Sequence, residues 1–292
     1  MAAASPDPQT VSLPPRFERF RSYQGAQNAV LSVRFSPDGK FISAAGYNGV
    51  NVWQVDTGSS VELPRRGSSP TKAKYIYPTS GWIYYEDYRH YILLLGSLEG
   101  DVVAWDWNKR RSAFELTRDA LPTTSSQQVT SIDILQPSSH QKARAVVSHY
   151  DRSISVWKIP LNGEYSLIFM VDLEFIPRTI AFDPATKYVY AFSMHGGNLG
   201  FAALHHANEL VVASTGKDFQ ILQLRDYLPL LTLQSRPATV LFPMQAAFLG
   251  DGIHLVVGTD SGLAIVYNAT TGKPVRSLRY PKGGLVQTVA VG

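Results

Sequence analysis

The stretch SPDGKFISAAGYNGVNVWQVDTG, from Ser36 to Gly58, alternates short apolar runs with turn residues. Glycine, asparagine, aspartate and proline separate the runs, which is typical of short antiparallel strands joined by tight turns. The second run ends on Trp53. If the stretch is one copy of a repeat, the chain should be searched for a docking surface as well as for an active site.

The same pattern returns further along the chain. It occurs in LLLGSLEGDVVAWDWNKRR (93–111), VVSHYDRSISVWKIPLNG (146–163) and LVVGTDSGLAIVYNATTG (255–272). The residues that end the second apolar run are Trp53, Trp105, Trp157 and Tyr267, and a fainter copy at 210–227 has Leu222 there. Successive spacings of 52, 52, 65 and 45 residues lie near or above the period expected for one propeller blade.

Further apolar runs flank these copies. LSVRF and RTIAF are examples upstream, and LIFMVDL and VRSL are examples downstream. Four antiparallel strands per copy would make one blade. On these residues the chain resembles the WD-repeat β-propeller family, most closely at 30–58, which implies an all-β propeller. Within the family it resembles divergent fungal WD-repeat proteins, some of which carry a transmembrane helix after the propeller, and it reads as truncated before such a helix.

The resemblance also implies roles for the repeated residues. The strand-ending aromatics would pack between adjoining blades, where each ring buries a large apolar area. In the family, a buried aspartate in the turn between the second and third strands joins a histidine and a serine or threonine. Only Asp151, with Ser153 nearby, matches that pattern, because the equivalent residues are Asn48, Glu99 and Ser261 and the Gly-His pair is absent. The blades should therefore depend more on apolar packing.

The repeats predict one propeller domain at 16–292 after a disordered leader at 1–15. The expected blades number about six to seven and lie at 25–64, 70–118, 127–175, 176–200, 201–235 and 240–280. The fourth is incomplete, with strands only at 178–182 and 188–194, and 285–291 would open an incomplete last blade. Alternatively, 176–235 is a single blade with an insertion. Residues 16–23 would supply the outer strand of the last blade and lie near 285–291.

Composition and charge narrow the function. The formal net charge is +4 and the basic residues are scattered, whereas nucleic-acid surfaces are usually denser in positive charge. Cysteine is absent, which excludes disulfides and thiolate metal sites. The first 15 residues lack a basic region followed by an apolar one, so we expect them not to act as a signal peptide, and the longest apolar run, near 91–95, is too short to span a membrane. These features predict a cytoplasmic location, with the nucleus as the alternative.

No known catalytic or ligand motif occurs. The seven histidines are dispersed without metal-ligand spacing, and the glycine pairs match neither a phosphate-binding loop nor a nucleophile elbow. The sequence therefore predicts no catalytic, cofactor-binding or metal-binding residue.

A tyrosine-rich segment at 72–95 is unusual for this chain. Tyrosine and tryptophan are enriched in protein interfaces, so the segment is a candidate partner-binding face. Alternatively, alternate rings pack between blades, or the rings and Lys72, Lys74 and Arg89 form a stacking platform for single-stranded nucleic acid. The candidate partner-binding residues are Tyr75, Tyr77, Trp82, Tyr84, Tyr85 and Tyr88.

The function expected from these features is a noncatalytic scaffold that binds protein or peptide partners through the loops and top face of a propeller. Two alternatives remain. One is an enzyme with its site in the central channel, for which histidines and carboxylates gathered around the channel would argue. The other is a nucleic-acid-binding propeller.

Overall fold

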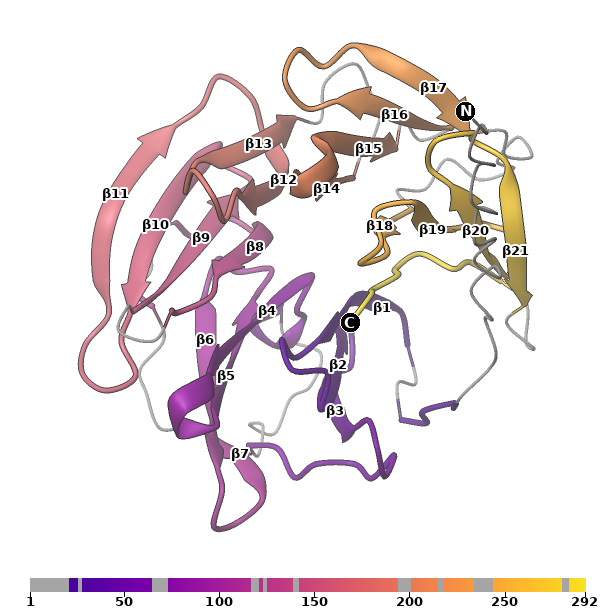
Figure 1. Ribbon diagram of the computed structural model, residues 1–292. Helices are drawn as coiled ribbons and strands as arrows, with labels where there is room; N and C mark the ends of the chain where they lie inside the picture. Colours follow the sequence, from indigo (N-terminus) through magenta and orange to yellow (C-terminus); the bar gives the residue numbers. More distant parts are fainter. Residues whose placement is uncertain are drawn as a thin grey trace, which may run out of the picture.

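The computed structural model forms a ring of small antiparallel sheets (Figure 1). The structure describes residues 21–25, 28–64, 73–116, 121–122, 125–138, 142–193, 201–214, 218–233, 244–279 and 284–292. In this part of the chain, no helix is long and apolar enough to cross a membrane.

Five sheets of three or four strands form the blades. Blade 1 contains β1 (Val30–Phe35), β2 (Phe41–Gly46) and β3 (Gly49–Gln54). Blade 2 contains β4 (Thr79–Tyr85), β5 (His90–Gly96), β6 (Val102–Asn108) and β7 (Ala113–Glu115). Blade 3 contains β8 (Val129–Leu135), β9 (Ala143–His149), β10 (Ser153–Ile159) and β11 (Ser166–Asp172).

The remaining strands complete the ring. In the part of the chain that the structure describes, the short sheet contains β12 (Pro177–Phe182) and β13 (Val189–Ser193). Blade 4 contains β14 (Ala202–His205), β15 (Leu210–Ser214), β16 (Phe219–Gln223) and β17 (Pro229–Leu233). Blade 5 contains β18 (Ala246–Phe248), β19 (His254–Gly258), β20 (Leu263–Asn268) and β21 (Pro274–Arg279). Among the described residues, the 3₁₀ turns are η1 (Ala73–Tyr75), η2 (Glu86–Tyr88) and η4 (His206–Asn208).

The turn between β1 and β2 shows how local sequence sets this geometry. Gly39 has a φ of +71°, which favours glycine, and its N–H donates to Ser36 O at 2.8 Å. The Asp38 carboxylate accepts the Ser36 hydroxyl at 2.8 Å and the Tyr91 hydroxyl at 2.6 Å. Since Tyr91 belongs to β5, the aspartate of this turn also joins blade 1 to blade 2.

The strand-ending aromatics lie in the core. Trp53, Trp105, Trp157 and Tyr267 are all buried, on β3, β6, β10 and β20 respectively. Trp105 belongs to the apolar cluster between blades 1 and 2, Trp157 to the cluster between blades 2 and 3, and Tyr267 to the cluster between blades 4 and 5. Trp53 differs, because its ring lies 5.3 Å from that of Tyr23 in the N-terminal segment.

Strand register identifies the equivalent positions independently of the aromatic rings. Trp157, Leu222 and Tyr267 each follow a register shift between the third and fourth strands of their sheets. Leu222 therefore occupies the repeat position that the fainter copy predicts, although it is not aromatic.

The prediction of about six to seven blades is wrong, because the structure contains five. The expected incomplete fourth blade is the short sheet, whose two strands match the predicted ones closely. It is separate from β14–β17, so 176–235 is not a single blade. With two strands, the short sheet is too narrow to cover the whole face of a neighbouring blade. Apart from its partner β13, β12 packs mainly on β8 and β9 of blade 3.

The C-terminal segment does not open another blade. Residues 284–292 contain no strand. Instead, Gln245 N–H donates to Gln287 O at 2.9 Å and Val286 N–H donates to Thr259 O at 2.8 Å. The segment thus runs beside the inner part of blade 5 and ends near Phe35 of β1 (Figure 1).

The structure describes only part of the N-terminal segment for which an outer strand was predicted. Residues 1–20, including the predicted leader, lie outside the described residues. Within 21–25, Arg21 Nη2 donates to Asp56 O at 3.0 Å, and Tyr23 packs on Trp53. This segment therefore lies against blade 1. Residues 21–23 of the predicted outer strand at 16–23 form no strand, and residues 16–20 lie outside the described residues.

Candidate functional site

Most rings of the tyrosine-rich segment face the interior. Tyr77, Trp82 and Tyr85 are buried, and Tyr75 and Tyr84 are half-buried. The Trp82 indole donates to Ser43 Oγ at 3.0 Å in blade 1, and the Tyr85 hydroxyl donates to Ile159 O at 2.6 Å in blade 3. These three rings join blades, as the packing alternative expects. Lys72 lies outside the described residues, and partner binding by the segment stays a prediction.

Tyr88 is the exception among the six candidates, with 67% of its surface exposed. It ends η2, the turn between β4 and β5, where the left-handed Arg89 (φ +47°) starts the return strand. Its ring lines two clefts between blades 2 and 3, of about 1110 Å³ and about 540 Å³. Leu161 and Asn162, from the turn between β10 and β11, also line both clefts.

The two clefts form one groove at the end of the ring where these turns gather, which we call the Tyr88 groove. Lys109 and Arg110 line the larger cleft together with Glu115 and Glu164. At its floor, His90 Nε2 lies 2.9 Å from Asp106 Oδ1, and Asp106 is buried. The groove therefore combines an exposed aromatic ring with charged groups of both signs.

The central channel is the second hollow, with a volume of about 340 Å³. Polar side chains on its inner strands connect successive sheets: Thr79 Oγ1 accepts from Ile132 N–H at 3.2 Å, and Thr179 Oγ1 accepts from Ala202 N–H at 3.3 Å. Ser32 and Ser80 hydroxyls also meet at 2.9 Å. These bonds run around the ring from blade 1 to blade 4.

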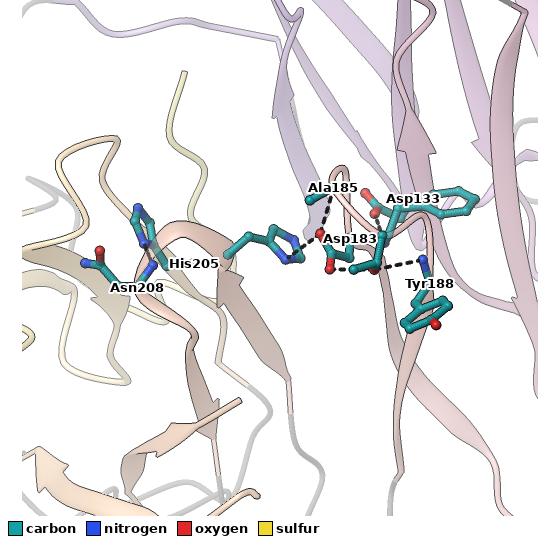
Figure 2. Close-up of polar contacts among 9 residues, drawn as sticks. Asp133, Asp183, Ala185, Tyr188, His205 and Asn208 are labelled. Atoms are coloured by element: carbon teal, nitrogen blue, oxygen red, sulfur yellow. Dashed lines mark hydrogen bonds and ion pairs between the residues drawn. The ribbon is translucent and has the colours of Figure 1, made fainter. Parts of the chain in front are cut away.

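Asp133 makes a contact of the same kind between sheets, in which its own carboxylate is the acceptor (Figure 2). It lies on β8, and its Oδ2 accepts from Phe182 N–H at 2.7 Å in the short sheet. Burial raises the pKa of Asp133, and the hydrogen bond from Phe182 N–H and the nearby Arg34 side chain offset only part of that effect. Burial therefore disfavours the ionised form of Asp133 beside the channel.

Asp183 lies next to this contact and is held differently (Figure 2). The Thr186 hydroxyl donates to Asp183 Oδ2 at 2.6 Å, which holds the pKa of Asp183 below its ordinary value. Its other oxygen lies 3.7 Å from His206 Nδ1. On blade 4, Asn208 Nδ2 donates to Gly252 O at 3.0 Å and so connects η4 with blade 5.

Asp151 and Ser153 do form a network, although Asp151 is exposed rather than buried. The Ser153 hydroxyl donates to Asp151 Oδ1 at 2.7 Å, and His149 Nδ1 lies 3.4 Å from the same hydroxyl. His149 Nε2 lies 3.2 Å from Gly100 O in blade 2. Burial lowers the pKa of His149, which favours its neutral form.

Comparison with known families adds one match. The family described as WD domain, G-beta repeat matches residues 17–54, a range that ends with β3 of blade 1. Together with the ring of repeated sheets, this match decides the family.

The chain is a WD-repeat β-propeller. A comparison with curated proteins finds no match.

Two features of this WD-repeat β-propeller were missed in the sequence. His149 completes the Asp151 network from the end of β9, four residues before Ser153, and a histidine at that spacing was a usable signal. The serines and threonines of the inner strands were also overlooked, although they repeat in LSVRF, TSGW and VTSI. Among the described residues, no cluster of three or more histidine, aspartate or glutamate side chains is arranged to hold a metal ion.

Proposed function

We propose that this WD-repeat propeller is a noncatalytic scaffold that binds a protein or peptide segment in the Tyr88 groove. The observation that carries the proposal is the exposed Tyr88 ring between two adjoining clefts. Large rings next to a concave surface are common energetic centres of protein interfaces.

The size and rigidity of the groove support this use. Its turns are held by blades 2 and 3, whose shared apolar cluster includes Ile83, Trp157 and Ile159. A groove supported by packed strands binds without a large ordering cost. Both clefts are lined by basic and acidic residues, such as Lys109 and Glu115 in one and Asp87 in the other, which favours a partner segment that carries charges of both signs.

Proximity labelling in cells provides the test, with Tyr88→Ser compared to the wild-type chain. Truncating a central tyrosine weakens an interface by about 1.4 kcal/mol or more, which corresponds to a loss of roughly tenfold in affinity. We therefore expect a defined set of neighbours to lose most of its labelling.

Tyr188→Ser is the matched control, because Tyr188 is 68% exposed and lies on the turn of the short sheet, away from the groove. The control should retain all neighbours. Unchanged labelling with Tyr88→Ser, in a variant that melts like the wild type, would contradict the proposal.

A further inference from the structure

Arg178 has no counter-ion among the described residues. Its Nε is buried and makes no hydrogen bond, and its guanidinium carbon lies 4.7 Å from the centre of the Phe201 ring. Burial lowers the pKa of Arg178, and no carboxylate offsets that effect. A buried, unpaired donor is costly, so its presence calls for an explanation.

The position of Arg178 does not require an arginine. A register shift between Pro177 and Thr179 places Arg178 at a bulge in the innermost strand pair. Blades 1 and 3 have the same shift, at Leu31 and Thr130. Since leucine and threonine serve at equivalent positions, the fold alone does not account for the charge, and bulges often re-aim a side chain toward a site.

Other donors face the same hollow. Arg178, Arg34 and His206 all line the central channel. The Nδ1 atom of His206 is also buried without a hydrogen bond among the described residues, although Asp183 Oδ1 lies 3.7 Å from it. The channel volume of about 340 Å³ is enough for a small group or one side chain. A planar guanidinium with free N–H groups is suited to two-point contact with a carboxylate or phosphate.

We propose that the central channel is an oxyanion-binding site, in which Arg178 holds a carboxylate or phosphate group with support from Arg34 and His206. The site is separate from the Tyr88 groove and does not depend on its function. Asp133 lines the same channel and opposes an incoming anion when it is ionised. Removing Arg178 should therefore weaken anion binding, and removing the Asp133 carboxylate should strengthen it.

The test is a titration of the intact chain with inorganic phosphate and, separately, with acetyl-glutamate-amide. NMR follows the Arg178 Nε–H resonance, assigned by its loss in Arg178→Met. We expect a saturable shift at concentrations up to about 10 mM, together with a rise in melting temperature of about 2 °C or more. The tighter of the two probes identifies the source of the oxyanion.

Variants separate binding from folding. Arg178→Met should abolish the thermal response but melt at or above the wild-type temperature, since it removes a half-buried charge that has no counter-ion among the described residues. Arg178→Lys should retain a weakened response to phosphate. Asp133→Asn should strengthen binding several-fold, because it removes the opposing carboxylate. Arg276→Met, on the exposed outer strand β21, should respond like the wild type.

Two results would overturn the proposal. One is the absence of any Arg178 Nε–H shift with either probe. The other is an Arg178→Met variant that still responds to the probes, or that melts well below the wild type, since the latter would show that Arg178 serves the fold.

Discussion

The indole of Trp157 lies in the apolar cluster between blades 2 and 3, and its Nε1–H donates to Ser155 Oγ at 2.9 Å. Replacing it by alanine leaves a cavity that the surrounding strands cannot close. We expect Trp157→Ala to lower the free energy of unfolding by about 3–5 kcal/mol, measured by chemical denaturation. Trp157→Phe, which keeps most of the volume, should cost clearly less. Equal stability of the alanine variant and the wild type would contradict the core role.

Asp133 gives a pH-dependent prediction at the same scale. Because its folded-state pKa lies above the ordinary value of 3.8, the folded chain loses stability as the pH rises through the interval between these two values. Asp133→Asn keeps an oxygen for Phe182 N–H and removes the charge. It should stabilise the protein at pH 7 and have almost no effect on stability below the ordinary value. If Asp133→Asn stabilised the protein more as the pH falls, the pKa of Asp133 would be shifted in the opposite direction. Melting curves across this pH range measure it.

Among the strands, β11 is the least protected. Its five apolar residues, 167–171, are each 43–50% exposed. It is the outermost strand of blade 3, which is the blade next to the two-stranded short sheet (Figure 1). An exposed apolar edge strand is a template for association with other chains. We expect Phe169→Lys to reduce aggregation on heating, measured by light scattering, with a change in unfolding free energy within about 0.5 kcal/mol.

Phe114→Lys is the contrasting variant for this element. Phe114 lies on β7, the outer strand of blade 2, but is buried in the cluster between blades 1 and 2. The Phe114→Lys substitution places a charge in this cluster, so the variant should unfold readily and aggregate more. Aggregation of Phe169→Lys equal to that of the wild type would show that β11 is not the associating edge.

For the molecule as a whole, the C-terminal segment connects blade 5 with blade 1. Gly258, at the end of β19, lies so close to the carbonyl of Val286 that a Cβ atom there would overlap it. Gly258→Ala should therefore displace residues 285–291 and speed hydrogen exchange in β18 and β1. Gly250→Ala, where a Cβ meets no atom, should leave exchange unchanged. Unaltered exchange in both variants would mean that the segment does not close the ring.

Periodic patterns in the chain determined the repeat, the all-β class and the buried aromatics. The turn at Ser36–Lys40 and the strand-ending positions of Trp105 and Trp157 are local signals, because each follows from the spacing of residues within one repeat. For the same reason the two strands of the short sheet were predicted closely, whereas the count of blades was not. Counting blades requires knowing which strands share a sheet.

Only the tertiary structure decided which rings are buried and which groups meet in the channel. Tyr85 and Tyr88 are three residues apart in one tyrosine-rich segment, yet one reaches the backbone of blade 3 and the other faces solvent. Arg178 lies beside Phe201, more than twenty residues away, and across the channel from residues of blade 1. Burial and charge pairing depend on contacts between different sheets, and those contacts exist only once the ring has formed.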